Sequence, residues 1–161
     1  DWLNGKPTDA GTNYLNRQGL GSVAGQLSEY KCFHAAQLIH SPANLSTIEA
    51  STLPIAGLTA WNALQYGNLQ AGETVLLHGT GGVSIFALQF AKVRGAKAIV
   101  TSSSDDKLKR SQQLGADLLI NYKTTPDWEA IVKQFTEDRG ADVIVETVGG
   151  KNLQRSLDAL R

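Results

Sequence analysis

A glycine-rich stretch after an apolar run is the part of this sequence best suited to binding chemistry. Residues 79–84 read GTGGVS and follow TVLLH directly. In loops of this kind one glycine makes a tight turn, a second lets the backbone approach a pyrophosphate, and the next helix offers free N–H groups. The stretch predicts a dinucleotide-binding loop, and the alternative is a strand-to-helix turn without a ligand. The residues expected to contact the cofactor are Gly79, Thr80, Gly81, Gly82 and Val83.

The third position of the loop pattern is Ser84, where such loops commonly have glycine. That position serves the packing of the helix on the strand rather than contact with the ligand. Serine is small, and its hydroxyl can form a hydrogen bond within the first helical turn. We therefore expect this departure to alter the packing slightly and to leave the phosphate-binding backbone intact.

Three hydroxyl side chains follow the second predicted strand, where an NAD-binding domain usually has a carboxylate for the ribose 2′-hydroxyl. They belong to Ser102, Ser103 and Ser104, and Lys107 follows one helical turn later. Hydroxyl donors and a cation suit a 2′-phosphate, so the pattern favours NADP(H) over NAD(H). The alternative is a serine-rich helix N-cap beside a solvated lysine. The two aspartates between them are interpreted as carboxylates that favour a helix N-terminus.

Alternating strands and helices must position these two loops. Strands are predicted from TVLLHG, AKAIVTS, DLLIN and ADVIVET, and helices over residues 83–94, 105–114, 125–137 and 151–160. Strands separated by single helices pair in parallel through right-handed crossovers. Runs such as VLL and VIV are apolar throughout, as in strands buried on both faces. The sequence therefore predicts an α/β fold with a doubly wound parallel sheet, the Rossmann arrangement.

The first part of the chain differs from this regular pattern. Residues 1–22 are predicted to form loops, residues 23–33 (VAGQLSEYKCF) a strand, and Leu38–Ile39 a short second strand. Residues 46–49 have the pattern of a capping box, and Pro54 interrupts the helix before a second one over residues 55–66. We place a domain boundary near residue 45.

The overall composition excludes several classes of function. Fifteen basic and fifteen acidic residues balance, so nothing favours nucleic acid or an anionic membrane surface as a partner. No apolar run reaches the roughly 20 residues of a membrane span. A lone cysteine fits a reducing compartment, and we predict a cytoplasmic protein. Cys32 and His34 are interpreted as a buried thiol and a surface histidine rather than a metal site, which needs three or four ligands. His40 and His78 are isolated and are expected to cap a loop or strand end.

Three stretches, in this order and spacing, resemble the medium-chain dehydrogenase/reductase superfamily. They are LPIAGLTAWNAL, AGETVLLHGTGGVSIFALQFAKVRGAKAIVTSSSDDKL and LGADLLINY. The chain looks most similar to the zinc-independent, quinone-oxidoreductase-like branch, whose members are often named alcohol dehydrogenases. The resemblance implies that residues 1–45 are the C-terminal part of a β-rich GroES-like catalytic domain. Residues 46–161 would be a Rossmann domain without its last strands. The chain is thus expected to be an internal fragment, which its lack of an initiator methionine fits, and a homodimer is expected of the full-length protein.

The resemblance also implies roles for individual residues. The loop after the first strand matches the pyrophosphate site, and the serine run with its lysine matches the 2′-phosphate site. The position of a catalytic zinc ligand in zinc-dependent relatives is Ala56, which has no donor atom, so no metal is expected. The remaining matches are Tyr122 at the adenosine end, Val148 and Gly149 beside the nicotinamide ribose, and Thr59 near the nicotinamide. For Tyr122 the alternative is a half-buried aromatic at a strand end.

The resemblance therefore implies an NADPH-dependent, zinc-independent oxidoreductase. Hydride would pass between the nicotinamide and a quinone, enone or other activated carbonyl, while the protein positions the reactants. One alternative is an NADP-dependent alcohol dehydrogenase, which runs the same transfer in reverse. Another is a nucleotide-binding sensor or structural relative without turnover. No catalytic residue is identified, and the expected partner is a small carbonyl, quinone or alcohol.

Overall fold

The computed structural model describes residues 24–161, and the chain divides into two units, Asp1–Leu45 and Ser46–Arg161. In the first unit the described residues form loops and one short 3-10 helix, η3 (Ala35–Gln37). His34 caps this helix, because its Nδ1 accepts a hydrogen bond from the backbone N–H of Ala36 at 3.2 Å. The predicted loop over residues 1–22 lies outside the described residues.

The two strands predicted before residue 45 are wrong for the part of the chain that the structure describes. Residues 24–45 contain no strand, and Leu27, Tyr30 and Ile39 are exposed. A strand needs a neighbour to take its backbone hydrogen bonds, and alternation of residue types does not supply one. The thiol of Cys32, expected to be buried, is exposed as well.

The second unit begins with the predicted capping box, which is confirmed. In front of α1 (Thr47–Ala50), the Ser46 hydroxyl accepts the backbone N–H of Glu49 at 3.3 Å, and the Glu49 carboxylate accepts the N–H of Ser46 at 2.8 Å. Pro54 lies at the start of a π-helical turn, η4 (Leu53–Gly57), which leads directly into α2 (Leu58–Tyr66). The predicted interruption at this proline is therefore present as a change of helix type.

Four parallel strands form the sheet of the second unit, in the order β3-β2-β1-β4. The fold prediction, an α/β fold with a doubly wound parallel sheet, is confirmed. The strands are β1 (Thr74–His78), β2 (Lys97–Ser102), β3 (Leu118–Asn121) and β4 (Val143–Val145). The helices that connect or follow them are α3 (Gly82–Val93), α4 (Asp105–Gln113), α5 (Trp128–Phe135) and α6 (Lys151–Ala159). No helix within residues 24–161 is long and apolar enough to cross a membrane.

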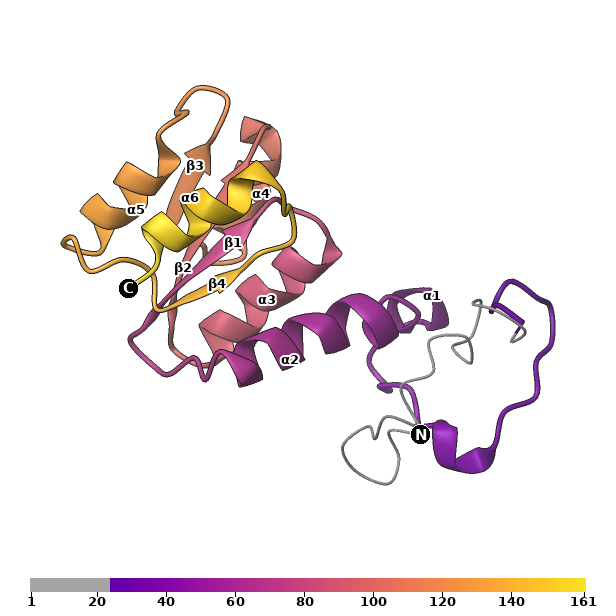
Figure 1. Cartoon of the computed structure of the whole chain (residues 1–161). Coiled ribbons are helices and arrows are strands. Elements are labelled where there is room, and N and C mark those ends of the chain that lie inside the picture. Colours follow the sequence, from indigo (N-terminus) through magenta and orange to yellow (C-terminus); the bar gives the residue numbers. More distant parts are fainter. Residues whose placement is uncertain (1–23) are drawn as a thin grey trace. The chain divides into compact units, whose positions relative to one another are not determined.

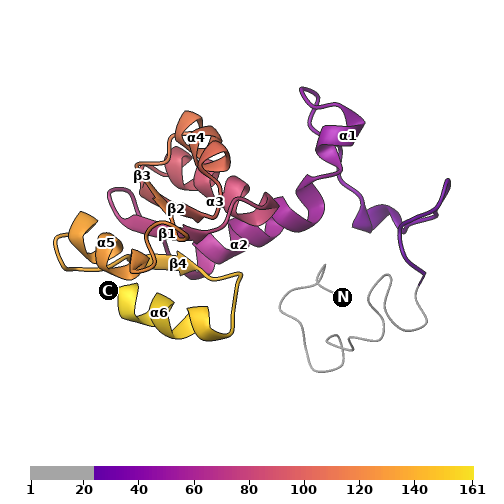
Figure 2. The same cartoon turned by 90° about the horizontal axis from the view of Figure 1, so that it is seen from above.

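Helices cover both faces of this sheet (Figures 1 and 2). One core lies between the sheet and α2, α3 and α4, and includes Leu64, Leu88 and Leu108. A second core lies between the sheet and α5 and α6, with Trp128 and Val132 among its members. Because both faces are covered, the strand residues are apolar in succession, as in Val75–Leu77, which are fully buried.

The strand order determines where a ligand can be held. The chain moves from β1 to β2 and β3 on one side and then returns to place β4 on the other side of β1. In open parallel sheets ligands bind beyond the carboxyl ends of the strands, at such a reversal. The segments that follow β1 and β4 meet there, and those that follow β2 and β3 lie along the same edge.

Candidate functional site

The loop between β1 and α3 has an open backbone face. Gly79 has a φ of +75°, a conformation that side chains other than glycine rarely adopt. Gly81 is the N-cap of α3, has no side chain to cap it, and lies at φ −79° and ψ 176°. A Cβ atom added to Gly81 would meet nothing within 4 Å. The space beside Gly81, at the N-terminus of α3, is therefore open to a ligand, and the free N–H groups of a helix N-terminus suit an anion.

Ser84 joins the helix to the strand that precedes it. Its side chain is buried, and its hydroxyl donates to the backbone carbonyl of His78, the last residue of β1, at 2.7 Å. The hydroxyl was expected to bond within the first helical turn, and this detail is wrong. The bond runs across the loop instead, from the first turn of α3 to the end of β1.

Ser84→Ala should lower the free energy of unfolding by about 1 kcal/mol, because the buried carbonyl of His78 loses one donor. Nucleotide affinity should stay within about twofold of the wild type. Denaturant titration and nucleotide titration of the same preparation measure the two quantities. A variant that keeps its stability but binds nucleotide much more weakly would mean that the hydroxyl contacts the ligand.

Seven of the predicted site residues line one cavity of about 250 Å³, which we call the loop cavity. They come from the glycine loop, from the end of β2, from α4 and from the residue after β3. Residues more than 40 positions apart in sequence are thus brought to one place by the carboxyl ends of three strands. The lining residues are Gly79, Thr80, Gly81, Ser102, Ser103, Lys107 and Tyr122.

The three serines of the run have different roles. Ser104 is the N-cap of α4, where its hydroxyl accepts the backbone N–H of Lys107 at 3.5 Å, and it does not line the cavity. The Ser102 hydroxyl is buried and accepts the N–H of Ser104 at 3.3 Å. The N-cap interpretation thus holds for Ser104, whereas Ser103 and Lys107 face the cavity.

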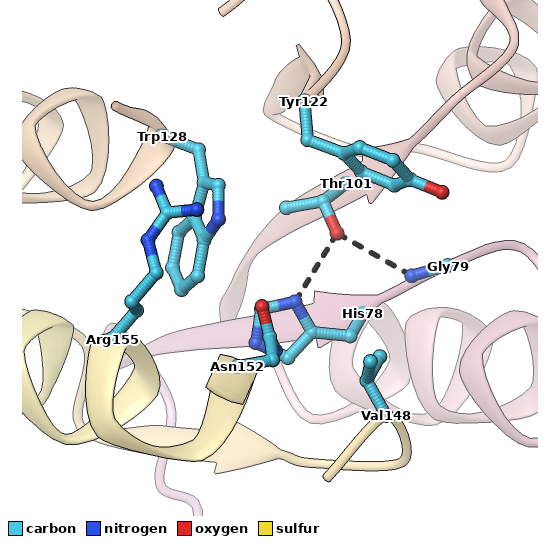
Figure 3. Close-up of a pocket in the computed structure, with 8 residues that line it drawn as sticks. All are labelled: His78, Gly79, Thr101, Tyr122, Trp128, Val148, Asn152 and Arg155. Carbon is cyan, nitrogen blue, oxygen red and sulfur yellow. Dashed lines mark hydrogen bonds between the residues drawn. The ribbon is translucent and has the colours of Figure 1, made fainter. Parts of the chain in front are cut away.

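A second cavity, of about 260 Å³, opens beyond the strand ends on the α5 and α6 side and is called the strand-end cavity (Figure 3). Tyr122 and Gly79 line it as well as the loop cavity, so the two adjoin. Trp128 and Val148 add apolar walls. The full lining is His78, Gly79, Thr101, Tyr122, Trp128, Val148, Asn152 and Arg155.

One wall of the strand-end cavity is formed by three planar side chains in contact. The indole of Trp128 meets the imidazole of His78 edge to face, with ring centroids 4.9 Å apart. The guanidinium of Arg155 lies 4.9 Å from the centre of the same indole and pairs with the Glu129 carboxylate. Burial, the largest single effect, raises the pKa of Glu129, but the hydrogen bonds that its carboxylate accepts and the charge of Arg155 together outweigh burial and lower that pKa. The pair thus stays charged and fixes the indole.

Buried polar groups form the floor of this cavity. His78 Nδ1 lies 3.2 Å from the Thr101 hydroxyl, and His78 Nε2 lies 3.0 Å from the Ser156 hydroxyl. Burial lowers the pKa of His78, and the nearby Glu146 carboxylate, which acts in the opposite direction, does not cancel this effect. His78 lies at a strand end, as expected, but it is not isolated, because both ring nitrogens have buried hydroxyl partners.

Glu146 links this floor to the loop after β4. Its carboxylate accepts the backbone N–H groups of Val148 at 2.6 Å and Gly149 at 2.9 Å, the amide of Asn152 at 2.9 Å, and the hydroxyl of Ser156. Burial alone raises the pKa of Glu146, but these hydrogen bonds lower it to about 2. The N–H groups of Val148 and Gly149, expected beside a nicotinamide ribose, are therefore occupied by this carboxylate.

Five other predicted residues, Thr59, Gly82, Val83, Ser104 and Gly149, do not line either cavity. Thr59 is exposed on α2, Ser104 caps α4, and Gly82 and Val83 form the first turn of α3. A Cβ atom on Gly82 would lie 3.1 Å from the Cβ of Ala56, so η4 packs against the start of α3. Gly149 lies next to Val148 and has a φ of +70°.

Several residues of the site were not found from the sequence: Thr101, Trp128, Glu146, Asn152, Arg155 and Ser156. Their hydrogen-bond partners are far apart in the chain, since His78 is 23 residues from Thr101 and 78 residues from Ser156. The one sequence signal for this buried network was His78, a polar residue at the end of the otherwise apolar run of β1. Within residues 24–161, no three His, Cys, Asp or Glu side chains are grouped so as to hold a metal ion.

Comparison with known proteins adds a family to this geometry. The family described as zinc-binding dehydrogenase matches residues 82–161. A zinc-type alcohol dehydrogenase-like protein of Schizosaccharomyces pombe is 43% identical over 165 aligned residues, which cover 99% of this chain and 46% of that protein. The chain spans about half the length of the curated relatives it matches.

Solved structures share the fold. A protein of Sinorhizobium meliloti 1021, provisionally named an alcohol dehydrogenase, is 50% identical with a TM-score of 0.81, over 86% of this chain and 40% of that one. An NAD-dependent alcohol dehydrogenase is 39% identical, with a TM-score of 0.69 and coverage of 74% and 35%. A quinone oxidoreductase of Pseudomonas syringae pv. Tomato DC3000 is 32% identical, with a TM-score of 0.70 and coverage of 76% and 38%.

Proposed function

Because the chain belongs to the medium-chain dehydrogenase/reductase superfamily, we propose that it supplies the NADP(H)-binding part of a zinc-independent oxidoreductase. Residues 46–161 are the Rossmann domain in this proposal, and residues 1–45 belong to a GroES-like catalytic domain. The observation that carries the proposal is the loop cavity, where an uncapped helix N-terminus faces Ser103 and Lys107. These groups suit a pyrophosphate and a 2′-phosphate.

The adenosine half of the cofactor is assigned to the strand-end cavity. Tyr122 and Trp128 provide aromatic walls for a flat base, and Val148 keeps its assignment beside the nicotinamide ribose. The NH₂ group of Asn152 donates to Glu146, so its amide oxygen is the atom directed at the cavity (Figure 3). An oxygen acceptor in this position suits the exocyclic amine of adenine. Tyr122, shared by both cavities, would lie between the base and the 2′-phosphate.

The bound nicotinamide supplies the hydride, and its acceptor in this proposal is a quinone, an enone or another activated carbonyl. The chain's own contribution is to bind and orient the dinucleotide at the strand ends. Zinc independence is supported by Ala56, which offers no ligand at a position where zinc-dependent relatives have one. The Pseudomonas syringae quinone oxidoreductase is a relative whose name fits this reaction class. Alcohol oxidation with NADP⁺ is the second candidate, and the alcohol dehydrogenase names among the relatives favour it.

Titration with NADPH and NADH at equal ionic strength, followed by nucleotide fluorescence, tests the cofactor assignment. The protein should carry the full reading frame of its gene. We expect NADPH to bind at least about tenfold more tightly, a difference of about 1.4 kcal/mol. Equal affinities would contradict the 2′-phosphate role of Ser103 and Lys107, and no binding of either would contradict the proposed function.

Turnover separates an enzyme from a nucleotide-binding relative without activity. With a quinone or an enone such as a vinyl ketone, the absorbance of NADPH should fall steadily. EDTA treatment followed by desalting should leave this rate unchanged, because no step of the proposal uses zinc. Tight NADPH binding without consumption of any quinone, enone or alcohol substrate would identify a sensor or structural relative instead.

A further inference from the structure

A continuous chain of hydrogen bonds runs beneath the strand-end cavity from the glycine loop to the loop after β4. The backbone N–H of Gly79 donates to the Thr101 hydroxyl at 3.4 Å, and that hydroxyl lies 3.2 Å from His78 Nδ1 (Figure 3). On its other side, His78 Nε2 lies 3.0 Å from the hydroxyl of Ser156, which donates to Glu146. Glu146 in turn accepts the N–H groups of the loop after β4.

The chemistry of the two ends determines the direction of every bond in this chain. An ionised carboxylate only accepts, so Ser156 must donate to Glu146 and can accept from His78 Nε2–H. A neutral imidazole that carries its proton on Nε2 has a free lone pair on Nδ1. Thr101 must then donate to Nδ1, which leaves its oxygen to accept from Gly79. Every buried side-chain nitrogen and oxygen of the described residues has a hydrogen-bond partner.

The two loops joined by this chain both contain glycines with positive φ angles. Gly79 lies at φ +75°, and Gly149 and Gly150 at +70° and +56°. Glycine in such conformations has little intrinsic preference, so the hydrogen bonds at each end determine the loop shape. Thr101 holds the N–H of Gly79 at one end, and Glu146 holds the loop after β4 at the other.

We propose that His78, as the neutral Nε2–H tautomer, is a positioning residue that couples the glycine loop to the loop after β4, so that dinucleotide affinity depends on the intact chain. This inference rests on the proposed function, because the two loops flank the assigned cofactor site. The coupling has a specific consequence. Removing a hydrogen bond on either side of the imidazole disconnects the same two loops. Removing both bonds should therefore weaken dinucleotide binding little more than removing one.

Protonation of His78 disturbs the same chain. A proton on Nδ1 would face the Thr101 hydroxyl as a second donor, so the Thr101 O–H would have to turn away from the ring and would lose its acceptor. The charged and titratable groups around the imidazole are Glu146 after β4, Arg155 on α6 and its partner Glu129 on α5, and Tyr122 after β3. Burial lowers the pKa of His78, so the chain is intact at neutral pH and is lost as the pH falls below the ordinary histidine value.

The test is a double-mutant cycle on NADP⁺ affinity with Thr101→Val and Ser156→Ala in the full chain at pH 7.5. Each substitution removes one hydroxyl on one side of His78 and keeps the side-chain size nearly the same. We expect each single variant to bind NADP⁺ about fivefold more weakly, and the double variant also about fivefold. Thr136→Val is the matched control, because Thr136 is a buried threonine bonded to Val132 and Gly140, outside both cavities.

Two further measurements keep the inference testable if a variant folds poorly. Nitrogen-15 NMR of the wild-type imidazole should show a proton on Nε2 and none on Nδ1 of His78 at pH 7.5. Affinity for NADP⁺ should fall between pH 7.5 and 5.0 more steeply in the wild type than in His78→Phe, which keeps a ring against Trp128. The 2′-phosphate titrates in the same window in both proteins, so the difference between them isolates His78.

The outcomes separate this inference from the proposed function. A double variant about 25-fold weaker than the wild type, or a proton on Nδ1, would overturn the coupling while NADP⁺ binding by the wild type stands. Equal affinities in the wild type and all chain variants would overturn it as well. A wild-type protein that does not bind NADP⁺ would overturn the proposed function and the coupling together.

Discussion

Gly81→Val is expected to weaken NADPH binding by about 100-fold, or about 2.7 kcal/mol, and to lower the free energy of unfolding by only about 1 kcal/mol, the usual effect of a poor N-cap residue. Gly81 lies at φ −79°, which any residue adopts, and a Cβ atom there meets nothing within 4 Å of the protein. The added side chain therefore occupies space outside the fold, where the assigned pyrophosphate must approach the backbone. Denaturant titration and NADPH titration of the variant give the two values.

Gly81→Ala and Gly57→Ala complete this experiment. The smaller side chain at Gly81 should have an intermediate effect on affinity. Gly57 also has an ordinary φ, but a Cβ atom there lies at normal contact distance from Leu53 and Phe86, outside both cavities. Its variant should bind NADPH as the wild type does. If Gly81→Val kept full affinity, the loop would be a structural turn and the cofactor would have to bind elsewhere.

Lys107→Gln is expected to weaken NADPH binding by about 10- to 100-fold while NADH binding changes by less than about twofold. A charge-assisted contact with a phosphate is worth about 1.5–3 kcal/mol, and only NADPH carries the 2′-phosphate. Lys107 lines the loop cavity with Ser103, and its side chain is exposed enough for salt to screen it. The ratio of the NADPH and NADH dissociation constants, measured at two salt concentrations, tests whether Lys107 contacts the 2′-phosphate.

Lys109→Gln is the matched control for this substitution. Lys109 lies on the same helix, α4, but its side chain is largely exposed and its nearest acid is Asp106 at 3.8 Å. The loss of net charge is the same, and the position is outside both cavities. A general electrostatic effect on a charged ligand would weaken NADPH equally in both variants. That result would remove Lys107 from the 2′-phosphate site.

The buried network affects stability as well as binding. The Glu146 carboxylate is ionised because four donors hold it, and its pKa of about 2 lies below that of an exposed glutamate. Its contribution to stability is therefore complete above about pH 4.5 and is lost as the pH falls toward 2. His78, whose pKa is also lowered, contributes above about pH 6.5 and loses this contribution on acidification. Acidification therefore lowers the free energy of unfolding through both groups.

Local patterns in the sequence predicted the second unit well. The apolar runs predicted four strands, and the glycine loop and the capping box at Ser46 were predicted where the structure has them. Each of these features depends on residues within one or two turns of one another. The prediction of two strands before residue 45 failed for the opposite reason, since pairing needs a distant neighbour that composition does not reveal.

The sequence by itself determined the order of the elements, the open glycine loop and the serine–lysine pattern that favours NADP(H), because backbone conformation responds to near neighbours. Only the tertiary structure decided which polar side chains meet. It assigned Ser104 to a helix cap rather than to a cavity, and it joined His78 to Thr101 and Ser156. The physical reason is the parallel sheet: every crossover brings the next strand's carboxyl end back to the same edge, so residues tens of positions apart become neighbours there.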